Sequence, residues 1–322
     1  MASNLTAENL NLLIAFSVYA AHGLLCFCSN FMLFLVVMRH EALRHCKEFV
    51  LMATLAFFDG LAFGLTNVLL GFYRIPKVLD ESYLERATQR MCFQVMGQSL
   101  FFFAYSPSCC MLFVLSFDRF FAVQWPLYYL GLSRNYAFVL IGTVLTVTTV
   151  GYSTLGLRSW LSNKNVTKMC WSSEAVVRVD YNIYSRICTF FVCLSLVMYA
   201  MAMVSYKRRL SKVIDGQLTN SLNSRKLKWQ KAFTRVVGIS CMFTFCFMVL
   251  PMLVNNFLVN FYPTLYYYFS GWIWLINCTN SFCNLVIFVN KQKDVRTGFW
   301  AMVKRKPMPA LLTEWNGITN KR

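Results

Sequence analysis

Charged side chains inside long apolar stretches are the residues of this sequence that could do chemistry. Asp59 ends the apolar sequence Leu-Ala-Phe-Phe-Asp, and Asp118 and Arg119 stand together near the end of another apolar stretch. A charged group in the interior of a bilayer is costly, so it is a functional hypothesis by default. Because Asp59 stands alone in its stretch, we expect this carboxylate to need hydrogen-bond partners or a cation.

Uncharged polar residues occur in the same kind of stretch. They are Asn30, Asn277, Asn280, Ser281 and Asn284. Such side chains commonly join helices through hydrogen bonds in lipid. We interpret Asn30 in this way.

The sequence lacks motifs of catalysis. It has no His-Glu-x-x-His, no Gly-x-Ser-x-Gly and no phosphate-binding glycine loop, and its three histidines, His22, His40 and His45, are poorly placed for catalysis. We therefore do not expect an enzyme.

The composition indicates a membrane protein. Of 322 residues, 57% are hydrophobic and 14% are charged, and the mean hydropathy is +0.49, whereas soluble domains carry about 25% charged residues. Uncharged apolar runs of this length cross a bilayer as helices, because backbone groups in lipid must bond to one another. We expect spans near Leu12–Met38, Phe49–Phe72, Cys92–Val123, Tyr136–Leu157, Ile183–Tyr206, Ala232–Leu258 and Leu265–Val289.

The predicted fold is therefore an all-α membrane protein, a seven-transmembrane helix bundle that forms a single domain over residues 1–322. The first span lacks the basic start and cleavage site of a signal peptide, so we interpret it as a retained anchor. Asn290–Lys306 has an apolar face formed by Val295, Phe299 and Met302. This pattern predicts a short amphipathic helix in the membrane interface, within a cytoplasmic tail over residues 290–322.

Basic residues give the orientation, because they concentrate on the cytoplasmic side of membrane proteins. They follow the first, fifth and seventh expected spans, whereas the opposite side mixes Arg74, Lys77 and Arg90 with three acids. The N-terminus is then extracellular and the C-terminus cytoplasmic, in the plasma membrane. We attribute the net charge of +18 to this topology and to anionic lipids rather than to nucleic acid.

Two further features lie on the expected outer side. Asn4 and Asn165 begin Asn-x-Thr sequons, which predict glycosylation. Cys92 and Cys170 face the oxidising compartment, and a disulfide between them would hold the loop after span four over the bundle. The sequon at Asn277 falls within a span, and we interpret it as chance.

The segment Ser116–Tyr129, Ser-Phe-Asp-Arg-Phe-Phe-Ala-Val-Gln-Trp-Pro-Leu-Tyr-Tyr, resembles a motif of the rhodopsin-like G-protein-coupled receptors. It is similar to their Asp-Arg-Tyr box and the following Ala-Val-x-x-Pro-Leu-x-Tyr, with Phe120 in place of the tyrosine. The second-span motif Leu-Ala-x-x-Asp, ending at Asp59, and Asn30 in the first span also resemble this family.

Other family motifs are altered here. In span six, Phe245 and Pro251 resemble the family element, but Val249 replaces its tryptophan. In span seven, Asn284 and Phe288 are what remains of Asn-Pro-x-x-Tyr. Such altered motifs resemble those of nematode serpentine chemoreceptors, particularly the Srsx-type group.

The resemblance implies a receptor that passes a signal from a ligand to a heterotrimeric G protein. Asp118 would hold Arg119 in the inactive state, and the freed arginine would contact the Gα subunit with support from Tyr206. Asn284 and Phe288 would belong to the same switch. The acidic residue that the family often carries at the base of span six is replaced by Lys231.

The resemblance also implies a polar pocket in mid-membrane. Its members here are Asp59, Ser108, Asn280, Ser281 and Asn284. Their oxygens suit Na⁺, so the alternatives are a Na⁺ site at Asp59 and a protonated Asp59 in a dry hydrogen-bonded cluster. No other cofactor is expected.

The ligand pocket implied by the resemblance is apolar and aromatic. Its expected members are Phe101, Phe102, Tyr105, Met252, Asn256, Trp274 and Cys278. Phe101 stands where amine receptors carry an aspartate, and span seven has no lysine for retinal. A small neutral or lipophilic ligand fits such a wall. For any single aromatic, packing between helices or contact with lipid is an equally good interpretation.

Three alternatives stay open. The mixed charges of the outer loops leave room for a peptide ligand. A seven-helix transporter would show repeats and several mid-membrane charges, of which only Asp59 is found. The altered motifs of spans six and seven also leave open a receptor that no longer signals.

Overall fold

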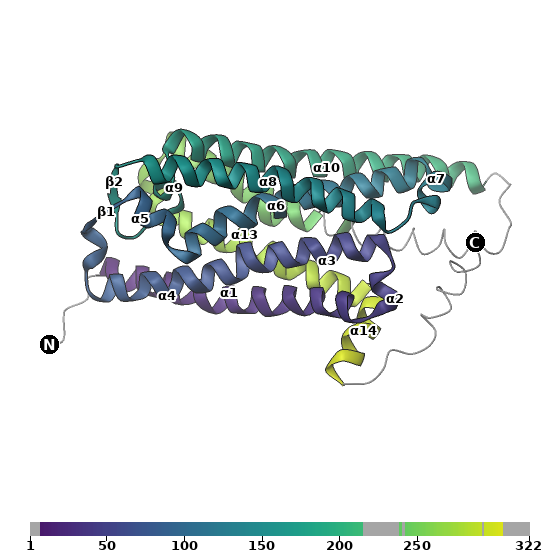
Figure 1. Ribbon diagram of the computed structural model, residues 1–322, viewed down its shortest axis with the longest axis horizontal. Coiled ribbons are helices and arrows are strands. Elements are labelled where there is room, and N and C mark those ends of the chain that lie inside the picture. Colours follow the sequence, from purple (N-terminus) through teal and green to yellow (C-terminus); the bar gives the residue numbers. More distant parts are fainter. Residues whose placement is uncertain (1–6, 215–237, 240–241, 292, 305–322) are drawn as a thin grey trace.

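The computed structural model describes residues 7–214, 238–239, 242–291 and 293–304. Long helices lie side by side in one bundle (Figure 1). In chain order they are α1 (Ala7–Arg39); a second helix made of α3 (Lys47–Asp59), the π-helix η1 (Gly60–Leu65) and α4 (Thr66–Leu79); α6 (Met96–Gln124); α8 (Asn135–Leu161); α10 (Arg178–Ile214); the π-helix η3 (Phe245–Val249) with α12 (Leu250–Phe261); and α13 (Pro263–Lys291).

Shorter elements connect or extend these helices. They are α2 (Glu41–Arg44), the 3₁₀-helix η2 (Ser82–Leu84), β1 (Arg86–Thr88), α5 (Gln89–Gln94), α7 (Pro126–Gly131), β2 (Asn165–Thr167), α9 (Ser172–Ala175) and α14 (Lys293–Val303). β1 and β2 pair in antiparallel fashion, with Ala87 opposite Val166. They bring together two loops that lie far apart in the sequence.

The helices are long and apolar enough to cross a membrane. Within the described residues six reach the length and hydropathy required, and the apolar segment Met242–Asn255 of the remaining helix is shorter and follows residues that lie outside the described part. Large apolar side chains cover the outward faces of α8 and α10: Val147, Leu157 and Phe190 are 60–62% exposed. Such a surface suits lipid, and the predicted all-α seven-helix bundle is confirmed.

The third helix starts later than predicted. Cys92 lies on the separate helix α5, and the backbone turns out of helical geometry at Val95 (ψ 120°) before α6 begins at Met96. The predicted span Cys92–Val123 is therefore wrong at its first residues.

The bundle has two distinct ends. We call the end that carries β1, β2, α5 and α9 the disulfide end, and the end that carries α2, α7 and α14 the arginine end (Figure 1). At the arginine end α14 packs on the bundle through Val295, which is fully buried in a cluster with Val36 and Leu43. Phe299 and Met302 pack against the same cluster. The predicted amphipathic helix therefore exists, although it is shorter than Asn290–Lys306 because α13 continues to Lys291.

Asn30 joins α1 to α13. Its side-chain Nδ2 donates to the carbonyl oxygen of Cys26 (2.9 Å) and to the hydroxyl of Ser281 (2.7 Å). The predicted helix-joining role of Asn30 is confirmed. Asn277 is buried inside α13, in agreement with the interpretation of its sequon as chance.

A glycine allows α1 and the second helix to touch. A Cβ atom at Gly64, in η1, would lie 2.5 Å from the backbone nitrogen of Phe27 and 2.6 Å from its Cα. Backbone atoms cannot swing away as side chains can, and small residues are what permits close helix approach in lipid.

Replacing Gly64 with alanine should therefore separate the two helices and lower the free energy of unfolding by about 1–3 kcal/mol. The melting temperature of the detergent-solubilised protein would report the loss. The matched control is Gly142→Ala, because a Cβ at Gly142 meets nothing within 4 Å. Equal melting temperatures for the two variants would contradict the close contact.

Candidate functional site

A cavity of about 540 Å³ opens at the disulfide end. This volume falls within the range of sites that bind small molecules, roughly 300–1,000 Å³. Residues of α1, α4, α6, α10, α12 and α13 line it, together with residues of the loop between α8 and α10.

Aromatic side chains form the part of the cavity nearer the bundle middle. We call Phe101, Tyr105, Tyr184 and Trp274 the aromatic wall. The rings of Phe101 and Tyr105 stack at 5.1 Å between centroids, and Trp274 meets Phe101 edge-on at 5.5 Å. The indole Nε1–H of Trp274 donates to Asn67 Oδ1 (3.0 Å), which fixes the ring against α4.

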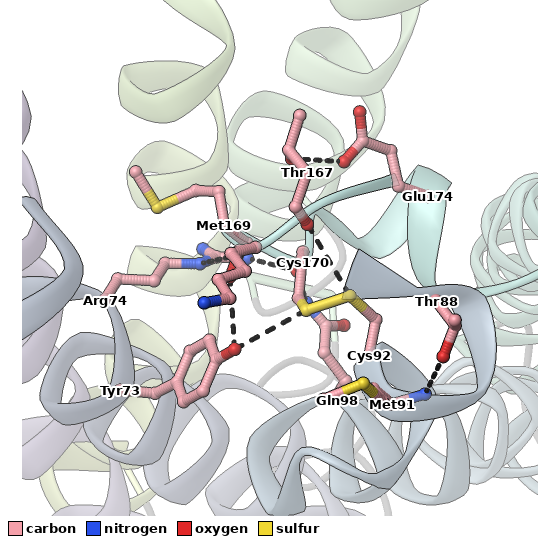
Figure 2. The surroundings of a disulfide bond; sticks show 11 residues. Tyr73, Arg74, Thr88, Met91, Cys92, Gln98, Thr167, Met169, Cys170 and Glu174 are labelled. Carbon is pink, nitrogen blue, oxygen red and sulfur yellow. Dashed lines mark hydrogen bonds between the residues drawn. A yellow bond between two sulfur atoms is a disulfide. The ribbon is translucent and has the colours of Figure 1, made fainter. Parts of the chain in front are cut away.

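The loop of residues 162–177, which we call the capping loop, covers the cavity and is held from several sides. A disulfide joins its Cys170 to Cys92 of α5, which confirms the predicted pairing. Figure 2 shows Tyr73 and Arg74 of α4 pointing toward the same loop. The Tyr73 hydroxyl donates to the Lys168 carbonyl oxygen (3.1 Å), and Gln98 Nε2 of α6 donates to the Cys170 carbonyl oxygen.

The edge of the capping loop adds an ion pair to this attachment. Lys168 pairs with Glu85, next to the β1–β2 sheet. The hydrogen bond from Lys168 and its positive charge hold the pKa of Glu85 below its ordinary value. Asn165, on β2, is exposed. Asn4 lies outside the described residues.

The predicted pocket residues fall into two groups. Phe101, Tyr105, Met252 and Trp274 line the cavity. Phe102 and Cys278 do not, which corrects the prediction. Phe102 is fully buried behind the wall and stacks on Phe93 (6.0 Å), and Cys278 Sγ accepts from Asn67 Nδ2 (3.1 Å). The side chain of Asn256 lies outside the described part of the chain.

Several polar residues of the cavity were not predicted from the sequence, among them Asn67, Arg74 and Asn277. Asn67 and Arg74 stand seven positions apart, which places them on one face of α4 about two turns from each other. That spacing in the sequence is sufficient to predict that the two side chains share a face of the helix. The position of Asn277 depends on contacts with a distant helix, and no local pattern shows it.

Asn277 connects the cavity to the sixth long helix, whose described part contains η3 and α12 and which we call helix six. In the orientation that satisfies its amide, Nδ2 donates to the carbonyl oxygens of Phe247 (3.0 Å) and Met248 (3.1 Å). Both belong to η3, and π-helical turns often occur at functional sites. A ligand that moved Asn277 would therefore act directly on the backbone of helix six.

Asp59 is buried in the middle of the bundle, where Ser108 of α6 donates to its carboxylate. Ser281 is occupied by Asn30 instead, whereas Asn280 Oδ1 is buried without a hydrogen-bond partner among the described residues. The side chain of Asn284 lies outside the described part. Of the predicted polar pocket, the structure thus brings Asp59 and Ser108 into direct contact.

At the arginine end, the guanidinium of Arg119 is wholly buried among oxygen atoms. Its Nε donates to Asp118 Oδ2 (3.0 Å), and its Nη2 donates to the hydroxyl of Tyr129 (2.7 Å). That hydroxyl lies 3.1 Å from Asp118 Oδ2 and 3.1 Å from Glu48 Oε1. Glu48 Oε1 itself lies 3.9 Å from Arg119 Nη2. We call Glu48, Asp118, Arg119 and Tyr129 the arginine network.

The second acid of this network comes from the helix made of α3, η1 and α4, which we call helix two. The family resemblance places this acid at the base of span six, where the sequence has Lys231, which lies outside the described residues. Glu48 supplies it from the first turn of α3. The next residue back, Lys47, donates to the carbonyl oxygens of Tyr129 and Leu132 (3.0 Å to the latter) and so fixes α7 against α3.

Two other predicted switch residues lie on neighbouring helices. Phe288 of α13 is buried in the cluster that contains Val295. Tyr206 of α10 is half-buried, and Tyr199, two turns earlier, is the tyrosine of this helix that packs in that cluster.

Tyr129 can be tested by removing its hydroxyl alone. Tyr129→Phe would leave buried charged groups with fewer hydrogen bonds, at a cost of about 1–3 kcal/mol. The melting temperature should therefore fall. The matched control is Tyr128→Phe, because Tyr128 is 66% exposed. Equal effects of the two variants would contradict a stabilising role of the buried hydroxyl.

Comparison with known proteins agrees with this arrangement. No curated protein matches the chain. A family model described as 7 transmembrane receptor (rhodopsin family) matches residues 29–289, a range that holds most of the cavity lining, Asp59 and the arginine network. Members of that family are receptors and not enzymes. Because the match covers most of the chain, this multi-pass membrane protein belongs to the rhodopsin family of G-protein-coupled receptors.

Proposed function

We propose that the protein is a chemosensory receptor that binds a small lipophilic or neutral molecule in its cavity and activates a heterotrimeric G protein. The observation that carries the proposal is the pairing of two features at opposite ends of one bundle. A cavity of ligand size lies at the disulfide end, and a buried arginine that is hydrogen-bonded to Asp118 and Tyr129 lies at the other.

The disulfide end would face the outside of the cell and the arginine end the cytoplasm. A disulfide persists in an oxidising compartment. The basic residues that follow the first, fifth and seventh spans belong to the opposite side. The exposed Asn165 is then in place for glycosylation. Membership in the nematode Srsx-type group is supported only by the altered motifs of spans six and seven.

The signal would pass through helix six. A ligand on the aromatic wall would displace Asn277 or Trp274, and the hydrogen bonds of Asn277 to η3 would carry that displacement into helix six. An outward movement there would open the arginine end. Arg119 would then exchange its bonds in the arginine network for contacts with the Gα subunit.

The residues at Asp59 fit a Na⁺ ion by their chemistry. The Asp59 carboxylate and the Ser108 hydroxyl that bonds it are hard oxygen ligands of the kind that such an ion takes. The buried Asn280 oxygen, which has no hydrogen-bond partner among the described residues, is a third candidate ligand. The bound ion would neutralise the charge of Asp59. The residues themselves would tie helix two to helix three while the receptor is inactive.

Glu48 provides the first test of this mechanism. Glu48→Gln keeps an oxygen that accepts from Tyr129 but removes a charge beside Arg119, so the inactive state should lose about 1 kcal/mol and the active fraction should rise about fivefold. Ligand-free signalling, measured with a panel of Gα subunits at matched surface expression, reports this change.

The control for that test is Glu41→Gln, because Glu41 is exposed and its ion pair among the described residues is with His45. Absence of any rise in basal signalling in the Glu48 variant, with every Gα subunit, would contradict G-protein coupling through the arginine network.

Asp59 provides the second test. Asp59→Asn should leave the receptor at the cell surface but abolish or bias its signalling, because the amide accepts from Ser108 without carrying charge. If Na⁺ binds there, raising Na⁺ should lower basal signalling of the native receptor and not of the variant. Unchanged signalling in Asp59→Asn would contradict the proposed role of Asp59 in coupling ligand binding to signalling.

A further inference from the structure

A positive charge is buried on the wall of the cavity. Arg74 of α4 is only 5% exposed and lines the cavity together with the aromatic wall. Its guanidinium lies over the rings of Trp171 (4.7 Å) and Phe16 (5.4 Å). Among the described lining residues it is the one cation.

The hydrogen bonds of Arg74 go to neutral acceptors, and Glu174, whose carboxylate attracts the guanidinium electrostatically, does not bond it. Arg74 Nε donates to the Met169 carbonyl oxygen (3.1 Å) and its Nη2 to the Cys170 carbonyl oxygen (3.0 Å), and both acceptors are neutral. No ion pair joins Arg74 to a carboxylate in the described part of the chain. Glu174, on the same cavity, is bonded to Thr167 (2.6 Å).

Such a site is chemically incomplete. A guanidinium has five N–H donors in a fork that matches a carboxylate, and the capping loop uses two of those of Arg74. A buried charge without a directly bonded counter-charge is expensive. The remaining donors and the lack of a bonded carboxylate in the described part of the chain therefore favour an anion in the cavity.

We propose that the ligand is a small organic acid whose carboxylate pairs with Arg74 and whose apolar body lies on the aromatic wall. This inference rests on the proposed function and narrows its ligand to a lipophilic molecule that carries a carboxylate. Arg74 and Asn67 lie about 10 Å apart along α4, and Asn67 bonds Trp274 of the aromatic wall. An aliphatic or aromatic acid that spans this distance contacts both.

Arg74 also holds the capping loop, so the test must separate charge from attachment. Tyr73→Phe is the matched control, because Tyr73 bonds the Lys168 carbonyl of the same loop and does not line the cavity. Loss of loop attachment weakens all ligands alike. Loss of the Arg74 charge weakens acids alone.

The probes are straight-chain and phenyl-substituted carboxylic acids of increasing length, each paired with its primary amide. Two readouts apply: the ligand-induced rise in melting temperature of the purified receptor, and G-protein signalling in cells. In the native receptor at least one acid should act at a concentration at least tenfold lower than its amide. Arg74→Gln should remove that preference, Arg74→Lys should keep part of it, and Tyr73→Phe should preserve it.

Two results would overturn the inference. One is that no acid binds better than its amide. The other is that Arg74→Gln weakens acids and amides equally. The proposed function fails separately, because basal signalling of Glu48→Gln needs no ligand and the melting-temperature readout needs no G protein.

Discussion

The burial of Arg119 is the constraint on which the arginine end depends. A guanidinium that is buried away from water must be surrounded by hydrogen-bond acceptors, because otherwise the free energy of unfolding falls by several kcal/mol. The chain satisfies it from three separate segments: Asp118 on α6, Glu48 on α3 and Tyr129 on α7. One buried charge thereby ties helix two, helix three and the short helix α7 to each other. Any state in which Arg119 leaves must loosen all three.

The disulfide end follows the same rule with a different outcome. Arg74 is buried as Arg119 is, but its partners are carbonyl oxygens and ring faces. At the arginine end, acids of the chain itself neutralise the charge of Arg119. At the disulfide end no acid of the described chain bonds the guanidinium, so a carboxylate from outside would complete the site, as expected of a binding site rather than of a structural ion pair.

Local features of the sequence were enough to predict the helices, the disulfide and the pairing of Asp118 with Arg119. Apolar length alone decides that a segment spans lipid, and adjacent residues on one helix must be neighbours in space. The separate helix α5 escaped prediction, because an apolar run does not show that the backbone turns at Val95. Phe102 was misplaced because one residue along a helix is a rotation of about 100°, which turns it away from a cavity that Phe101 faces.

The remaining misses share one cause. Glu48, Tyr129 and Asn277 act on residues far away in the sequence. Their partners depend on which helices pack together and at what height, and no periodicity of a single segment contains that information. The family often carries its second acid at the base of span six, whereas this chain places Glu48 on helix two.

The π-helical turn η1 has a consequence for how the second helix can vary. A π-helical turn holds more residues than an α-helical one. The presence of η1 therefore changes the direction in which the side chains of α4, including Arg74, point around the helix axis. Deleting a single residue between Gly60 and Leu65 would leave Asp59 in place and rotate Arg74 by about 100°, out of the cavity. The middle of the helix at Asp59 and its cavity-facing end can thus diverge independently, and sequence length across this one turn becomes a means of altering what a receptor of this design detects.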